Sequence, residues 1–155
     1  MADDIKINWD DIFQEGDIAY IDGDLEREPG LGTAVFMSLF TDRRARDDDP
    51  LDDKDDKRGW WGDQTSTYID DEIGSRLWLL DRAKTTTENY RLARIYIEEA
   101  LQWLISDGVA AKVETEIERA GVPGNDRLYF KVKIYKIDGN VEAYKFEDCW
   151  TGQYR

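Results

Sequence analysis

Residues 109–118 read VAAKVETEIE and residues 128–135 read LYFKVKIY, and the two segments share one pattern. Apolar residues alternate with charged or aromatic residues, as expected for strands that bury one face. Gly121 to Asp126 would turn the chain between them, and Asp138-Gly139 predicts a second tight turn into residues 141–146. We therefore expect three antiparallel strands joined by hairpins.

The charges on these strands predict how they align. The core-facing positions would be Val109, Ala111, Val113, Thr115 and Ile117 in the first strand and Leu128, Phe130, Val132 and Ile134 in the second. The other faces then carry Glu114 and Glu116 on one strand and Lys131 and Lys133 on its neighbour. Because opposite charges that face each other stabilise a strand pair, this register is favoured over a slipped one.

Two helices are expected before these strands, where they would cover the apolar face of the sheet. The first spans about residues 71–83 and has a broad apolar face made by Ile73, Leu77, Trp78, Leu79 and Leu80. The second would begin at a capping-box pattern formed by Thr85 and Glu88 and end at Asp107-Gly108. Between these limits apolar residues recur at helical spacing, at Tyr90, Ala93, Ile97, Ala100, Leu101 and Leu104.

The first forty residues predict extended structure followed by a short helix. Residues 5–9 alternate as in a short strand or extended arm, and Asp22-Gly23 predicts a hairpin within residues 17–26. A helix would follow from about Thr33, its candidate N-cap, to Phe40. The predicted fold is α+β: one domain over residues 1–155, in which an antiparallel sheet made from the N-terminal hairpin and the C-terminal strands packs against two to three helices.

The net charge and its distribution along the chain limit the kinds of partner that the chain is expected to bind. The chain of 155 residues has a formal net charge of −14. Residues 1–41 hold ten acidic against two basic residues, whereas residues 127–155 hold four against six. An acidic chain without a basic stripe is repelled by phosphate groups, so we expect no nucleic-acid binding and no membrane binding. A protein partner is the better expectation, although excess acid can also serve solubility alone.

The absence of a signal-like segment and the single cysteine limit the expected location and chemistry of the chain. The sequence has no basic leader before an apolar segment and no apolar run near 18 residues, so we expect neither a secretory signal nor a membrane span, and a cytosolic origin. The single cysteine, Cys149, has no partner for an internal disulfide, and no histidine is present to activate it. We expect Cys149 only to pack.

Residues 42–58 contain eight aspartates and six lysines or arginines. Such mixed charge with few apolar residues predicts a solvated, mobile loop. The aspartates do not match a calcium-binding EF-hand loop, because Lys57 stands where the fifth-position oxygen is needed if Asp53 is the first ligand. We therefore expect no metal and no cofactor.

A tryptophan pair, Trp60-Trp61, follows this loop. Two adjacent tryptophans are costly to leave in water, and arginine and tryptophan often dominate the energetics of interfaces. The candidate partner-binding residues are Arg43, Arg44, Arg58, Trp60, Trp61 and Arg76. The alternatives are that a tryptophan packs in the core and that Arg43 or Arg44 only balances nearby aspartates.

Three segments around these residues carry a resemblance to a known family. They are SLFTDRRA at residues 38–45, RGWWGD at residues 58–63 and IGSRLWLLDRAK at residues 73–84. The chain resembles, over nearly its whole length, the tail baseplate proteins of Mu-like contractile phages and prophages. That family is similar in turn to the lysozyme-like baseplate wedge proteins of larger contractile phages and to the matching baseplate subunit of type VI secretion. Those wedge relatives carry a Glu-Pro-Arg signature, whereas this chain has Glu28-Pro29-Gly30.

The resemblance implies a fold of the baseplate wedge type and a non-enzymatic subunit that joins the wedge to the first ring of tail sheath. Its partners would be baseplate and tail-sheath proteins, with multiple copies in each baseplate. Its location would be the virion tail baseplate, and the host cytoplasm during assembly. A free edge of the predicted sheet could accept an extended arm from a partner by strand addition.

Two other functions stay open. A peptidoglycan-degrading, lysozyme-like tail enzyme would need two carboxyl groups across a sugar site, for which Asp63 near Trp61 is the candidate. An acidic nucleic-acid mimic that inhibits a host enzyme would use the acidic N-terminal third, but the tryptophan-rich middle has no role in that account.

Overall fold

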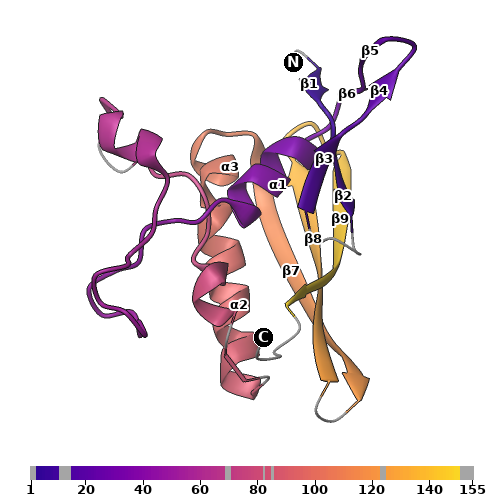
Figure 1. The fold of residues 1–155 in the computed structure, drawn as a ribbon. Helices are drawn as coiled ribbons and strands as arrows, with labels where there is room; N and C mark the ends of the chain where they lie inside the picture. Colours follow the sequence, from indigo (N-terminus) through magenta and orange to yellow (C-terminus); the bar gives the residue numbers. More distant parts are fainter. Residues whose placement is uncertain are drawn as a thin grey trace.

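The computed structural model describes residues 3–10, 15–68, 71–81, 83–84, 86–122 and 125–150. Along the chain, short strands are followed by one helix, an irregular segment, two further helices and three long strands (Figure 1). The predicted α+β class is confirmed. That residues 1–155 form one domain, and that residues 42–58 are mobile, stay predictions.

The three long strands form the predicted antiparallel sheet. β7 (Ala110–Val122), β8 (Asn125–Lys136) and β9 (Val141–Trp150) lie in the order β7-β8-β9. Glu114 lies opposite Lys133 and Glu116 opposite Lys131, which confirms the predicted register. A bulge between Ala110 and Lys112 shifts the start of β7, so Ala110 is buried and Ala111, predicted to face the core, is exposed. The side chain of Cys149 in β9 lies outside the described set, so its packing stays a prediction.

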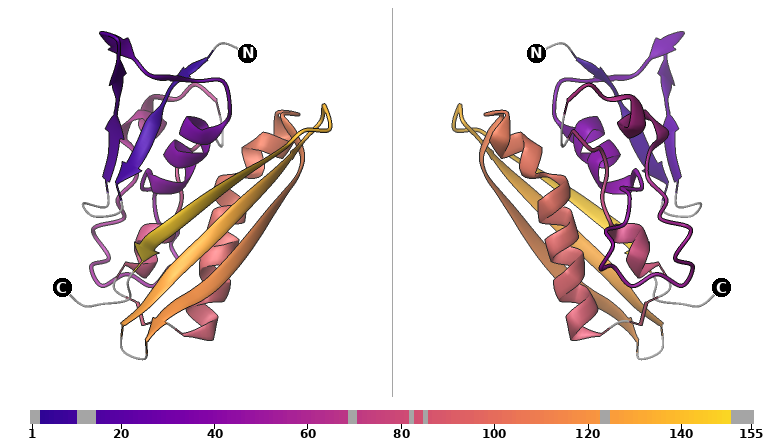
Figure 2. Two further views of the ribbon diagram at one scale, coloured as in Figure 1. Left: turned by 90° about the vertical axis from the view of Figure 1, so that its right-hand side faces the viewer. Right: turned by 90° about the vertical axis from the view of Figure 1, so that its left-hand side faces the viewer.

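The core lies between this sheet and three helices. As predicted, the inward side chains of β8 are almost fully buried, with 2% exposure or less at Leu128, Phe130, Val132 and Ile134. α1 (Gly32–Phe40), α2 (Thr87–Ala100) and α3 (Gln102–Ser106) supply the opposite side of the core. Figure 2 shows the sheet as a slanted layer, with α2 along it and α1 between the sheet and the N-terminal strands.

The long helical segment agrees with the prediction except at its start. Thr86 rather than Thr85 is the N-cap of α2, because its hydroxyl accepts a hydrogen bond from the Asn89 backbone N–H at 3.2 Å. Thr85 itself lies outside the described residues. The helix is interrupted at Leu101, between α2 and α3, and ends at Asp107-Gly108 as predicted.

The predicted helix over residues 71–83 is wrong. Among the described residues of this range, only a 3-10 turn forms, η2 (Leu77–Leu80). Leu77 and Leu79 of this turn pack against the core, and Leu80 is buried in it. Gly74, however, has a φ of +98°, which an α-helix cannot contain. The apolar spacing was misleading because a short turn can bury the same residues as a helix.

The N-terminal strands form small sheets of their own instead of extending the C-terminal sheet. The pairs are β1 (Asp4–Ile5) with β6 (Arg27–Glu28), β2 (Ile7–Asp10) with β3 (Glu15–Ile18), and β4 (Tyr20–Ile21) with β5 (Asp24–Leu25). The hairpin predicted at Asp22-Gly23 is confirmed, with positive φ values of 52° and 86° at these residues.

Thr33 connects α1 to these strands. It is not the predicted N-cap, since Leu31 precedes the helix and Thr33 is buried in its first turn. The Thr33 hydroxyl donates to the Ile5 carbonyl oxygen at 2.6 Å and accepts from the Ile7 N–H at 3.2 Å. At the same end the Leu31 N–H donates to the Tyr144 hydroxyl of β9 at 2.9 Å. α1 is therefore fixed to both the N-terminal strands and the sheet.

Candidate protein-interaction site

Residues 41–68 and 71–81 form a lobe beside α1 and α2 (Figure 1, left). We call this lobe the charged lobe. Its two ends run side by side. The Arg43 N–H donates to the Ser75 carbonyl oxygen and the Ser75 N–H donates to the Thr41 carbonyl oxygen, both at 2.9 Å. A Cβ on Gly74 would lie 2.3 Å from that Thr41 oxygen, so only glycine permits this closure.

An ion pair in the interior holds the lobe to α2. Arg76 is 6% exposed and donates to Asp49 Oδ1 at 2.6 Å and to Glu99 Oε2 at 2.7 Å. Its guanidinium also lies 4.6 Å from the centre of the Tyr96 ring. Asp49 belongs to the loop of residues 42–58, so Arg76 fixes this loop to α2.

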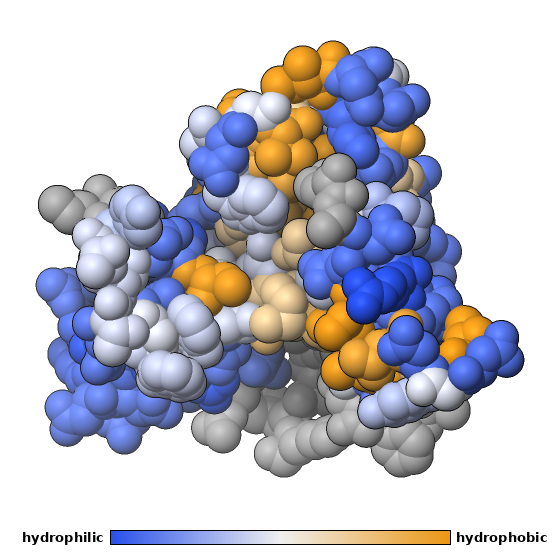
Figure 3. All heavy atoms as spheres, turned by 90° about the horizontal axis from the view of Figure 1, so that it is seen from above, coloured by the Kyte–Doolittle hydropathy of each residue, from blue (hydrophilic) through white to orange (hydrophobic). Residues whose placement is uncertain are grey.

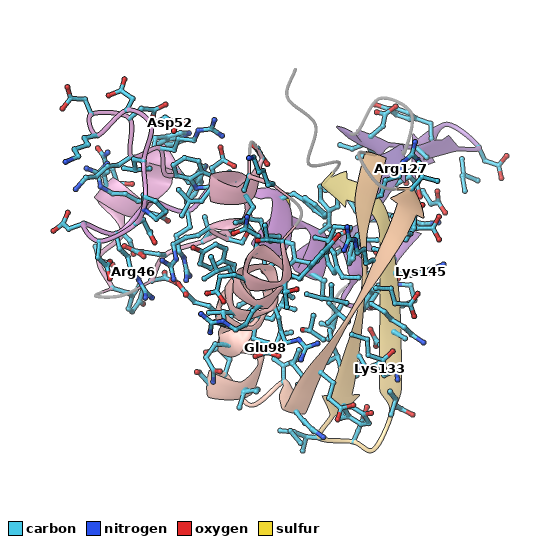
Figure 4. The ribbon with its side chains drawn as sticks, turned by 90° about the horizontal axis from the view of Figure 1, so that it is seen from below. Arg46, Asp52, Glu98, Arg127, Lys133 and Lys145 are labelled. Carbon is cyan, nitrogen blue, oxygen red and sulfur yellow. The ribbon has the colours of Figure 1, made fainter. Side chains whose placement is uncertain are left out.

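Glu99 of α2 is the point at which three arginines converge. Besides Arg76, it pairs with Arg43 at 3.2 Å and with Arg46 at 3.0 Å; Arg46 comes from the lobe (Figure 4). Burial alone would raise the pKa of Glu99, but the hydrogen bond from Arg76 and the charges of the three arginines outweigh it and lower that pKa. Glu99 therefore stays ionised at neutral pH and binds the lobe to the helix.

Trp60 and Trp61 lie on the surface of the charged lobe. They are 43% and 73% exposed, and their ring centroids are 5.5 Å apart with an interplanar angle of 45°. A Cβ on Gly62 would lie 2.2 Å from the Trp60 ring, so that ring rests directly on the backbone. The alternative that one of the pair packs in the core is therefore wrong.

Arg58 and Arg44 border this pair. Arg58 has a φ of +47°, a region that non-glycine residues seldom adopt. Its guanidinium lies 4.5 Å from the centre of the Trp78 ring and pairs with Asp42 at 2.9 Å. Arg44 is exposed and shares with Arg58 and Trp60 the lining of a small pocket of about 130 Å³.

Four of the six predicted residues thus meet at one place, which we call the arginine–tryptophan surface: Arg44, Arg58, Trp60 and Trp61. The other two, Arg43 and Arg76, are part of the network around Glu99, with side-chain exposures of 17% and 6%. They support the lobe from within. That any of the six binds a partner stays a prediction.

A groove of about 620 Å³ separates the charged lobe from α1 and α3. In the view from above, the lobe stands at the left beside a hollow, and apolar residues occur in separate patches (Figure 3). Met37, Trp103 and Trp60 are among the residues that line the groove. The sequence did not predict this groove. Residues 34–40 did carry a signal, because apolar residues on every face of a helix indicate that it has more than one contact face.

Within the described residues, no three or more histidine, cysteine, aspartate or glutamate side chains are grouped as a metal site. None of the described helices is long and apolar enough to cross a bilayer. The expectations of no metal, no cofactor and no membrane binding stay predictions.

Comparisons with known proteins place this fold in a family. Residues 31–141 match the family model described as phage protein GP46. Over 150 residues the chain is 42% identical to baseplate protein gp46 of Escherichia phage Mu, covering 96% of this chain and 98% of that protein. It is 34% identical over 148 residues to Mu-like prophage FluMu protein gp46 of Haemophilus influenzae, again covering 96% and 98%. The chain therefore belongs to the phage GP46 family, as the resemblance to Mu-like tail proteins predicted.

Proposed function

We propose that this chain is a structural subunit of the baseplate of a contractile phage tail. The observation that carries the proposal is the 42% identity, over 96% of the chain, to a phage Mu protein named as a baseplate protein. Its partners are then other baseplate and tail proteins, and several copies enter each virion tail. Assembly takes place in the host cytoplasm.

Within the baseplate, the chain joins the wedge to the first ring of tail sheath. The arginine–tryptophan surface is the contact proposed toward the wedge. Its tryptophans leave aromatic area in water that a partner would cover, and its arginines supply charged donors. The network around Glu99 holds this surface in place, because it fixes the lobe to α2.

Strand addition is the contact proposed toward the sheath. Among the described residues, no further strand pairs with the outer edge of β7 or of β9. These strands are 13 and 10 residues long, so either edge offers a row of backbone N–H and C=O groups. An extended arm of a partner that pairs with such an edge gains main-chain hydrogen bonds that can resist tension.

The proposed role involves no catalysis. A lysozyme-like mechanism needs a carboxyl group whose pKa is raised, so that it can donate a proton near neutral pH. Burial would raise the pKa of the partly buried Glu142, but the Tyr144 hydroxyl and Lys136 outweigh it and lower the pKa, as the arginines do at Glu99. Both groups are therefore ionised and unsuited to act as the acid.

Deletion and complementation test the proposal. The gene is removed from the phage or prophage, and wild type, Trp61→Ala or Tyr68→Ala is supplied in its place. Wild type should restore contractile tails that contain this chain, detected by electron microscopy and immunoblotting. Trp61→Ala should reduce its incorporation by about thirtyfold, which corresponds to the lower limit for an interface hot spot. Tyr68→Ala is the matched control, because Tyr68 is 76% exposed in the same lobe.

Hydrogen exchange tests the strand addition separately. In the free chain, the outward N–H groups of β7 and β9 should exchange with solvent, and in purified tails one of the two strands should gain protection at every second residue. Protection at neither strand would refute strand addition. Normal tails without the gene, or the absence of the chain from wild-type tails, would refute the structural role itself.

A further inference from the structure

The groove between the charged lobe and α1 has an apolar floor. Met37 of α1, which is 40% exposed, and Trp103 of α3 both line this groove. The indole N–H of Trp103 donates to Ser38 Oγ at 2.9 Å, so its polar atom is already satisfied and the ring offers apolar surface. Ala34 and Ala100 also line the groove and are too small to fill it.

The rim of the groove is acidic. Its charged lining residues are Asp4, Asp63, Asp71, Glu72 and Asp107, and no lysine or arginine is among the described residues that line it. Asp63 accepts the Ile73 N–H at 3.2 Å, and Glu72 lies 3.9 Å from Arg43. Asp71 and Asp107 form no ion pair within the described part of the chain. A groove lined by one sign of charge attracts the opposite sign.

We propose that this groove binds a segment of another baseplate protein in which a lysine or arginine stands next to an aliphatic residue. The aliphatic residue covers Met37 and Trp103, and the cationic group reaches Asp71 and Asp107. The stem of a lysine or arginine suits such a site, because it covers apolar surface while its charged end stays at the polar rim. The inference rests on the proposed baseplate function and names the chemistry of one partner.

A second copy of this chain fits the groove less well than a basic partner. The β4–β5 hairpin is an exposed apolar projection, with Tyr20 74% and Ile21 54% exposed. It also carries Asp22 and Asp24, so it would meet the acidic rim with like charge. Charge complementarity therefore favours a basic segment of a different protein.

Charge reversal with a matched control tests the proposal. Asp71→Lys with Asp107→Lys reverses two of the five acidic charges of the rim, and Asp48→Lys with Glu98→Lys makes the same change in net charge at exposed positions outside the groove; Glu98 lies on α2 (Figure 4). Circular dichroism and thermal melting check that both variants fold. The rim variant should enter tails about tenfold less than wild type, and the control within about twofold.

The outcomes separate the groove from the baseplate role. Normal incorporation of the rim variant would overturn the groove proposal and leave the structural role intact. An equal loss in the control would overturn it too, because total charge would then be the cause. Absence of the wild-type chain from tails would instead refute the proposed function.

Crosslinking in assembled tails identifies the occupant. Met37→p-benzoylphenylalanine places a photoreactive group on the groove floor, and mass spectrometry then reads the peptide joined to it. The expected product is a segment of another tail protein with lysine or arginine beside an aliphatic residue. A crosslink to a second copy of this chain, a crosslink to an acidic segment, or no crosslink in tails that contain the variant would overturn the proposal.

Discussion

The charged lobe and the three-stranded sheet are stabilised by different interactions. The sheet buries a row of apolar side chains on β8 and pairs neighbouring strands residue by residue. The lobe depends instead on the buried Arg76, which binds Asp49 and Glu99, 27 and 23 positions away in the sequence. It also depends on glycines that permit close backbone contacts. The sheet should therefore be destabilised mainly by loss of apolar volume, and the lobe mainly by loss of charge pairing.

The largest effect is expected in the core of the sheet. Phe130 is 2% exposed, and its ring centroid lies 5.0 Å from that of Phe146. Phe130→Ala should lower the free energy of unfolding by about 4 kcal/mol, because it removes buried apolar area and leaves a cavity. Urea unfolding followed by circular dichroism measures this. A loss below about 1 kcal/mol would mean that the sheet is not the stabilising core.

Arg76→Met should have the next largest effect, and a local one. It leaves Asp49 and Glu99 without their buried partner, which is expected to destabilise the lobe by about 3 kcal/mol. Hydrogen exchange in residues 42–58 should rise while β8 stays protected. Arg44→Met is the matched control, since it removes the same charge from an exposed position. Equal loss of protection in β8 would show that lobe and sheet unfold together.

The same contrast explains what the sequence could predict. Alternation and facing charges such as Glu114 and Lys133 are local patterns, and they predicted the strands and their register. The burial of Arg76 could not be predicted in this way, because its partners come from a loop and from a distant helix. Glu99 did carry a signal, since it lies beside Ala100 and three positions after Tyr96 on the face of a helix that packs against the core.

At the arginine–tryptophan surface the sequence left two interpretations open. Trp60 and Trp61 could bind a partner or one of them could pack in the core; both are exposed, and partner binding stays a prediction. The groove escaped prediction because its lining comes from residues between 4 and 107, which only the fold brings together. The sequence could identify single residues of the site, but it could not identify the groove that the fold forms between distant segments.

Two glycine substitutions, one in the lobe and one in the sheet, should cause smaller losses of stability. Gly74 and Gly139 both have positive φ, at 98° and 89°. A Cβ on Gly139 in the sheet hairpin would meet nothing within 4 Å, so Gly139→Ala should cost about 1 kcal/mol from backbone strain alone. Gly74→Ala should cost about 2 kcal/mol, because it must also displace the Thr41 carbonyl and its hydrogen bond. Thermal melting of both variants checks the order, and equal values would contradict the close contact at Gly74.

Acid should loosen the lobe before the sheet. The pKa of Glu99 is lowered in the folded chain, so its stabilising effect is present above the pKa of an unfolded glutamate, about 4.3, and is lost as pH falls toward the folded value. Proteolysis within residues 42–58 by an acid-active protease should therefore increase as the pH falls from neutral to below about 4.3. Glu99→Gln should be cleaved readily at neutral pH and at acid pH. A wild-type chain that shows no such increase would mean that Glu99 does not hold the lobe.

The smallest effect is expected from the charges on the outer face of the sheet. Lys133 pairs with Glu116, and Glu116→Lys would place three lysines together with Lys131. Because these groups are in contact with water, Tm should fall only slightly, and the addition of Lys133→Glu should restore it. The difference should also fade in about 1 M salt, where the screening length is about 3 Å. If Glu116→Lys were instead as damaging as Phe130→Ala, then charge would hold the sheet as it holds the lobe, and the two regions would not differ in the way their burial indicates.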